Sequence, residues 1–295
     1  MDKPPPAPPP LPPPPPSPPS RPTSRVKLRT GGSVIDALLE KSLAALQDEH
    51  AASHTFEKRE VSTPFGSFTI FERTVQTQSE ASFVLAHRVL PSTDVTGLRV
   101  WPCSFHLLEH LVGTSGTLLA VAGCDPIRVV ELGAGTGIVG LGVAATLGTR
   151  AMVVVTDPAI PCGDGTSLDL LQRNLDANAT LAVARKLLWG DAHDVAALRD
   201  ELGGASDVVV GSELLYREDS VAALVETVRA LEPSMVVLAQ QTRPAGMEIE
   251  HACISLMQRA GFDATHAPVV ATPAVIYTFI KKRSTISRRH SSESE

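Results

Sequence analysis

A glycine-rich stretch near the middle of the chain constrains the fold more than any other feature. An apolar run ends at Glu131, and the glycines Gly133, Gly135 and Gly137 follow it. Small and apolar residues then recur at helical spacing as far as Leu147. Because glycine adopts positive φ and lets a ligand approach the backbone closely, the stretch predicts a strand, a tight turn and a helix. We expect a cofactor to lie on the turn.

The glycines alone leave the identity of this cofactor open. Residues 135–140 also match the G-x-G-x-x-G pattern of dinucleotide-binding folds, and a glycine loop that serves only as a turn is a further alternative. An acid directly before the turn, Glu131, favours a ligand with a positive charge over a pyrophosphate.

The second half of the chain alternates between strand and helix patterns. Helical patterns lie near 137–147, 167–177, 219–231 and 246–260, and strands are expected at 129–132, 152–156, 186–189, 207–210 and 235–239. This alternation predicts a Rossmann-like, doubly wound α/β sheet. The apolar segments 269–270 and 275–280 predict a closing antiparallel hairpin, which completes seven strands and is unusual for NAD-binding folds.

The region before the glycine stretch predicts a helix and a small extension. Trp101-Pro102 is typical of a helix start, and the helix that follows is expected to pack Phe105, Leu108, Leu111 and Val112. Within an extension over 31–96, we expect a helix from Ser33 to Leu46 and a β-hairpin with strands at 56–61 and 65–71. The main domain is expected over 97–282.

Both ends of the chain have biased composition. Residues 1–30 are rich in proline, which predicts a disordered or polyproline II tail, and residues 283–295 form a polar tail. The proline tail could dock to an SH3- or WW-type groove, and the polar tail could carry a nuclear import signal or a phosphorylation site. Solvated tails without a dedicated partner are the favoured interpretation.

Composition and charge exclude several classes of function. The net charge of −6 gives no general attraction to nucleic acid, and no apolar run is long enough to span a membrane. The N-terminus lacks an apolar signal segment, so secretion is not expected. The four cysteines form no C-x-x-C pair, which argues against a zinc site and favours a cytoplasmic, or also nuclear, location.

An acidic residue further along narrows the ligand. Asp157 stands twenty positions after Gly137, where the strand over 152–156 ends. In doubly wound folds a carboxylate at this place bonds the ribose hydroxyls of a nucleoside. The ligand is therefore expected to be a nucleoside derivative.

The motifs together resemble a known family. The segment from Glu131 to Gly137, with Asp157, is similar to motifs I and II of seven-strand methyltransferases, which bind S-adenosylmethionine. Further segments resemble the family-16 protein lysine methyltransferases: Val100-Trp101-Pro102, Leu188-Trp189-Gly190 and the run from Asp207 to Tyr216. The resemblance covers roughly 97–282 and implies a protein substrate such as a chaperone, an AAA ATPase or a translation factor.

The resemblance also implies roles for individual residues. The run from Glu213 to Tyr216 corresponds to the family's motif near the target lysine. From the chemistry of amine methylation we expect Glu213 to orient the amine and Tyr216 to wall its channel, and no dedicated general base is evident. The cysteine pattern predicts no metal. This sequence has glutamate at 213 where many members have aspartate. Asp191 would sit near the adenine, and the predicted cofactor-binding residues are Trp101, Glu131, Gly133, Ala134, Gly135, Asp157, Trp189 and Ser212.

Three other functions stay open at this point. They are a small-molecule methyltransferase on the same fold, an NAD(P)-binding oxidoreductase and an inactive nucleoside-binding scaffold. Methyltransferases that act on the amino groups of bases or of glutamine carry an Asp/Asn-Pro-Pro-Tyr motif. This sequence has Ser212 to Leu215 in that place, which disfavours nucleic-acid adenine or protein glutamine as the substrate.

Overall fold

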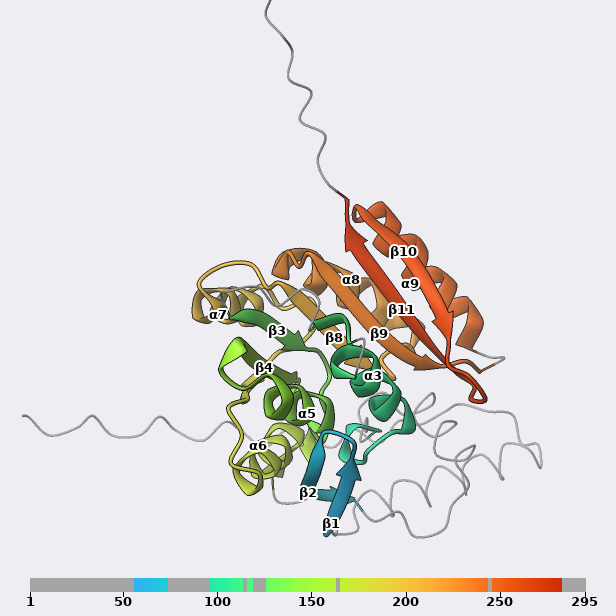
Figure 1. Ribbon diagram of the computed structural model, residues 1–295. Coiled ribbons are helices and arrows are strands. Elements are labelled where there is room, and N and C mark those ends of the chain that lie inside the picture. The colour runs from blue at the N-terminus through green and yellow to red at the C-terminus, as the bar shows by residue number, and fades with distance from the viewer. Residues whose placement is uncertain are drawn as a thin grey trace, which may run out of the picture. The chain divides into compact units, whose positions relative to one another are not determined.

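A seven-stranded sheet forms the centre of the molecule, with the strand order β10-β11-β9-β8-β3-β4-β7 (Figure 1). The computed structural model describes residues 56–73, 96–113, 116–118, 126–162, 165–243 and 246–282. The sheet is parallel except at β11, which runs antiparallel to both β9 and β10. Its strands are β3 (Ile127–Glu131), β4 (Ala151–Asp157), β7 (Val183–Lys186), β8 (Val208–Ser212), β9 (Met235–Gln241), β10 (Phe262–Pro268) and β11 (Ala274–Lys281).

Helices cover both faces of this sheet, which confirms the predicted doubly wound fold. One apolar cluster joins the sheet to α3 (Pro102–Val112), α5 (Ile138–Leu147) and α6 (Ser167–Ala177). A second joins the opposite face to α7 (Ala192–Leu202), α8 (Glu218–Leu231) and α9 (Met247–Arg259). Successive side chains of a strand point to opposite faces, so Val129 belongs to the first cluster and Val130 to the second.

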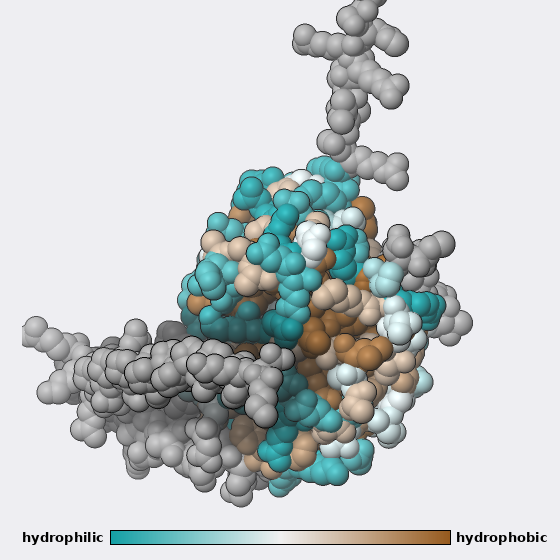
Figure 2. All heavy atoms as spheres, turned by 90° about the vertical axis from the view of Figure 1, so that its left-hand side faces the viewer, coloured by the Kyte–Doolittle hydropathy of each residue, from teal (hydrophilic) through white to brown (hydrophobic). Residues whose placement is uncertain are grey.

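The surface of the molecule is more polar than its core. On the face seen in Figure 2, hydrophilic side chains cover most of the surface and hydrophobic ones gather in one area. None of the helices in the described part of the chain is long and apolar enough to cross a membrane. The three described cysteines, Cys103, Cys162 and Cys253, are buried and form no disulfide.

Most predicted elements are confirmed to within a few residues, and three expectations are wrong. The third strand ends at Lys186, so Trp189 lies in the turn after it. The closing hairpin begins with β10, while Val270 lies in its turn with 90% of its surface exposed. Phe105 is 37% exposed, and Leu107 of the same helix is buried instead.

One helix was not predicted. α7 carries only three buried apolar side chains, which is too weak a pattern to stand out from its polar sequence. Its ends do carry ordinary signals, since Asp191 caps the first turn and Gly203 ends the helix in the left-handed conformation.

The predicted N-terminal hairpin is confirmed as β1 (Phe56–Thr63) paired with β2 (Gly66–Arg73). It docks on α6, because the side-chain oxygens of Asn174 and Asn178 accept hydrogen bonds from the backbone amides of Phe71 and Thr69 at 2.7 and 2.8 Å. The predicted helix over 33–46 and both predicted tails lie outside the described residues. The remaining elements of the described residues are η2 (Thr96–Leu98), η3 (Gly148–Arg150) and a short pair of strands, β5 (Pro161–Cys162) and β6 (Gly165–Thr166).

Candidate active site

A cavity of about 500 Å³ is lined by residues that follow the carboxyl ends of β3, β4, β8 and β9. Open α/β sheets bind ligands at this edge. Nine of the ten residues predicted for the site line the cavity, and Glu131 does not. The nine are Trp101, Gly133, Ala134, Gly135, Asp157, Trp189, Ser212, Glu213 and Tyr216.

The glycine loop needs glycine for two separate reasons. Gly133, Gly135 and Gly137 have φ angles of +56°, +55° and +79°, in the left-handed region that other residues rarely adopt. Space is equally restricted, because a Cβ atom at Gly135 would lie 2.4 Å from the carbonyl oxygen of Gly97. The loop therefore presents bare backbone at the cavity wall.

Glu131 lies behind this loop and supports it. Its side chain is 2% exposed, and Oε2 accepts a hydrogen bond from the Gly140 amide at 2.8 Å. Burial raises the pKa of Glu131 to about 8, the Gly140 hydrogen bond opposes the shift, and the charge of Asp157 adds to it. A Cβ atom at Gly140 would lie 2.1 Å from Val155 Cγ1, so Gly140 serves close packing between α5 and β4. Direct contact between Glu131 and a cofactor stays a prediction.

Asp157 joins the glycine loop to β4. The carboxylate is 5% exposed, and Oδ2 accepts a hydrogen bond from the Gly135 amide at 3.2 Å. Its other oxygen accepts a short hydrogen bond from Ser167 Oγ at the start of α6. These contacts hold one charged side chain at the place predicted for the ribose.

The two tryptophans line different parts of the cavity wall. Trp189 Nε1 is buried and has no hydrogen-bond partner among the described residues. Its ring lies against the glycine loop, with Cζ2 3.3 Å from where a Cβ atom of Gly133 would be. Trp101 is half-buried, and the guanidinium groups of Arg99 and Arg243 lie 5.1 and 5.8 Å from its ring centroid. A buried N–H without a partner is rare in folded proteins, so the Trp189 indole is a candidate donor to a ligand in the cavity.

The loop after β8 forms the other end of the site. Ser212 Oγ and Ser104 Oγ are hydrogen-bonded to each other at 2.9 Å. Glu213 follows with φ at +56°, which is uncommon for a residue with a side chain. Its amide donates to the Ala239 carbonyl at 2.8 Å, which holds this conformation. Backbone strain of this kind gathers at functional sites.

The carboxylate of Glu213 is buried and only partly satisfied. It is 8% exposed, and Oε2 accepts hydrogen bonds from Gln240 at 3.1 Å and from Arg243 at 3.3 Å. Oε1 is buried without a hydrogen-bond partner in the described part of the chain. Burial raises the pKa of Glu213, whereas the Cys103 thiol and the Arg243 charge oppose the shift. Oε2 is thus engaged, and the Cys103 thiol and the Gln241 backbone amide also lie close enough to favour the ionised carboxylate.

Two residues that sequence reasoning missed contribute to the site. Arg243 stands two residues after the end of β9, and Ser167 begins α6. Position is the signal that could have identified Arg243, because residues just past the carboxyl end of a central strand meet at one edge of the sheet. Ser167 carries the weaker signal of a hydroxyl in the first turn of a helix.

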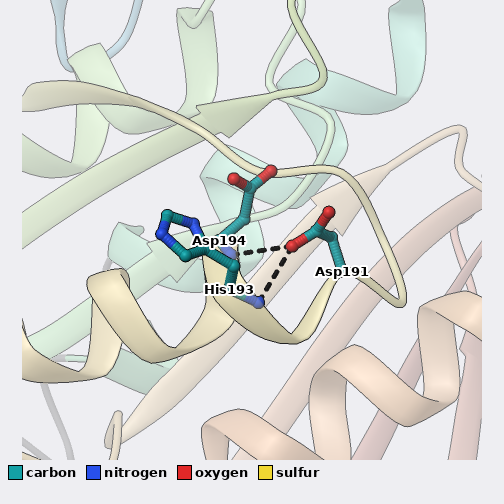
Figure 3. A group of neighbouring side chains, drawn as sticks. All are labelled: Asp191, His193 and Asp194. Carbon is teal, nitrogen blue, oxygen red and sulfur yellow. Dashed lines mark hydrogen bonds between the residues drawn. The ribbon is translucent and has the colours of Figure 1, made fainter.

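Asp191 does not line the cavity, contrary to the place that the resemblance gave it. Its Oδ1 caps α7 by accepting from the amides of His193 and Asp194 (Figure 3). The three residues could geometrically surround a metal ion. Both oxygens of Asp194, however, accept hydrogen bonds from Lys186, and one also accepts from the Leu188 amide. Helix capping and an ion pair account for the cluster.

S-adenosylmethionine fits the cavity in three respects. The glycine loop lines the cavity with bare backbone, Asp157 supplies a carboxylate for ribose hydroxyls, and Trp189 offers an indole N–H that has no partner among the described residues. The residues that would hold the cofactor are therefore Trp101, Gly133, Ala134, Gly135, Asp157, Trp189 and Ser212.

Comparison with known proteins places these features in a family. The lysine methyltransferase family model matches residues 91–260. The protein N-lysine methyltransferase METTL21A of Danio rerio is 29% identical over 199 residues, which are 64% of this chain and 82% of that protein. METTL21A of Mus musculus is 35% identical over 128 residues, 41% of this chain and 51% of that protein.

A fungal relative shows the same likeness. The protein-lysine N-methyltransferase EFM3 of Chaetomium thermophilum is 27% identical over 187 residues, which are 60% of this chain and 51% of that protein. The family model spans more than half of the chain and includes the glycine loop, Asp157, Trp189 and Glu213. This chain belongs to the lysine methyltransferase family.

Proposed function

We propose that this chain transfers the methyl group of S-adenosylmethionine to a lysine side chain of a protein substrate. The observation that carries the proposal is that one cavity is lined both by the glycine loop with Asp157 and by the partly satisfied carboxylate of Glu213. The first set suits a nucleoside, and the second suits a basic amine.

When bound, the cofactor supplies an electrophilic methyl group on a positively charged sulfur. Transfer forms a bond between the lysine nitrogen and the methyl carbon and breaks the carbon–sulfur bond, whose electron pair stays on sulfur. Such chemistry asks the protein mainly to position the amine and exclude water, and well-oriented reactants can supply most of the acceleration.

Glu213 is suited to orient the amine. A buried acceptor without a partner costs on the order of 1–3 kcal/mol, and a lysine amine that donates to Oε1 would recover this free energy. Tyr216 lines the same cavity and can wall the channel, with its ring face toward the nitrogen. Glu213 is therefore proposed as the orienting group and Tyr216 as the channel wall.

The substrate is proposed more narrowly from the family resemblance. Chaperones, AAA ATPases and translation factors are the candidate classes, in the cytoplasm and also the nucleus. A contact between the proline-rich segment and an SH3- or WW-type domain is proposed separately. It rests on composition alone, since that segment lies outside the described residues.

Calorimetry and labelling test this function. Titration should show binding of S-adenosylhomocysteine and no binding of NAD, which would reject the dehydrogenase alternative. The tritiated methyl group should then appear in protein when the chain and labelled cofactor are added to a cell lysate. Label found only in acid-soluble small molecules would overturn the assignment of a protein substrate.

A further inference from the structure

Arg243 occupies a position that the proposed chemistry has not yet used. It follows β9, while Glu213 follows the neighbouring strand β8, so two adjacent strand ends bring the pair together. Arg243 Nη2 lies 3.3 Å from Glu213 Oε2, and the guanidinium lies 5.8 Å from the Trp101 ring centroid. All three residues line the cavity.

A carboxylate beside the target amine creates a difficulty for methyl transfer. The amine must lose its proton before it can attack, because an ammonium nitrogen has no lone pair. An unperturbed lysine has a pKa of about 10.4. A carboxylate within about 4–6 Å favours the charged form and typically moves a pKa by about 1–3 units. Glu213 acting alone would therefore hold the lysine as an unreactive ammonium.

We propose that Arg243 neutralises Glu213, so that the carboxylate orients the substrate amine and still leaves it free to lose its proton to water. This inference rests on the proposed function. Arg243 engages Oε2 and leaves Oε1 for the amine, so both cations would bracket one carboxylate. Arg243 is a positioning residue, since it acts on the amine through Glu213.

The other groups around Glu213 cannot replace the positive charge of Arg243. Cys103, on α3, is a neutral thiol. Burial raises its pKa most, and the charge of Glu213 and the hydrogen bond to Glu213 raise it further. From β9, the side chain of Gln240 donates a hydrogen bond without a charge. From α9, Glu250 adds a second negative charge and accepts a short hydrogen bond from Tyr277.

The other two arginines that line the cavity have different partners. Arg217 lines the cavity and is paired with Asp219. Arg99 also lines the cavity and lies over the Trp101 ring. Among the described residues, Arg243 makes the ion pair with Glu213.

The pH dependence of methyl transfer tests the proposal. Initial rates of tritium incorporation into lysate protein are measured between about pH 6.5 and 10 for wild type, R243Q, R243K and E213Q, with the rate of the lysate alone subtracted. For R243Q, the rising limb of the profile should move up by about one pH unit or more, because the unbalanced carboxylate retains the ammonium. The rising limb of R243K should lie at about the same pH as that of wild type, because lysine keeps the positive charge. E213Q should move the limb down, because Arg243 is then unbalanced.

Two further readouts separate this role from a structural one. Calorimetric affinity for S-adenosylhomocysteine and the melting temperature should stay close to wild type in R243K and E213Q. A loss of activity in R243Q that is equal at every pH would overturn the proposal. If R243Q does not fold, an E213Q limb that stays in place or moves up overturns it instead. Failure of wild type to label protein at any pH would refute the proposed function itself.

Discussion

Replacing Gly135 by alanine tests whether the glycine loop holds the cofactor. The new Cβ atom would lie 2.4 Å from the carbonyl oxygen of Gly97, whereas real contacts essentially never fall below 3.0 Å. The contacting atom is backbone, so the loop itself has to move. Alanine at a left-handed φ costs a further 1–2 kcal/mol or so. We expect affinity for S-adenosylhomocysteine to fall at least about tenfold, which is about 1.4 kcal/mol of binding free energy.

Gly203→Ala is the matched control. Gly203 also has a left-handed φ, of +69°, but a Cβ atom there would meet nothing within 4 Å. The control should lose about 1 kcal/mol of unfolding free energy and retain full affinity for the cofactor product. Calorimetry measures the affinity of both variants for S-adenosylhomocysteine, and chemical denaturation measures their unfolding free energy, so the loss of binding is separated from the loss of stability. Wild-type affinity in G135A would refute the assignment of the loop as the cofactor cradle.

Three further changes test other parts of the site. Asp157→Ala should weaken S-adenosylhomocysteine binding at least about tenfold by calorimetry, and unchanged affinity would reject its role at the ribose. Glu131→Gln should gain stability relative to wild type as pH rises. Folding raises the pKa of Glu131 from 4.5 to about 8, so the unfolding free energy of the wild type falls with pH across that range, whereas glutamine does not ionise. Melting curves between about pH 5 and 9 check this, and a difference between the proteins that stays constant with pH would contradict it. Glu213→Ala should reduce methyl transfer by about tenfold or more while the affinity for S-adenosylhomocysteine stays near wild type; a parallel loss of both would place Glu213 at the cofactor instead.

The sequence predicted those parts of the fold whose physical cause is local. The strand, turn and helix around Gly133 to Gly137 follow from positive φ angles that glycine supplies without strain. The parallel strands β3, β4, β8 and β9 are buried on both faces and appear as continuous apolar runs. Periodicity and turn chemistry suffice for such elements.

Features that depend on tertiary contacts were harder to predict. β10 is an edge strand with only Phe262 buried, so the apolar Val269-Val270 pair looked like the better strand, although Val270 is exposed in the turn. The fold also places the Glu131 carboxylate against the Gly140 amide, nine residues further along the chain. Neither outcome follows from spacing alone.

In the candidate site, too, residues within sequence motifs were predicted, and residues placed only by tertiary contacts were not. Motifs from distant parts of the chain predicted nine residues that the structure brings to one cavity. Arg243 belongs to no such motif, and its contact with Glu213 exists only because β8 and β9 are neighbours in the sheet. The resemblance placed Asp191 near the adenine, whereas in the structure Asp191 caps α7 and does not line the cavity.

Identifying the methylated amino acid tests the central claim most directly. Lysate protein is labelled by the wild-type chain, and the labelled band is digested and sequenced by tandem mass spectrometry. The account predicts methyl groups on the side-chain nitrogen of lysine, absent when Asp157→Ala replaces the wild type. Methyl groups on another residue type, or label confined to small molecules, would contradict it.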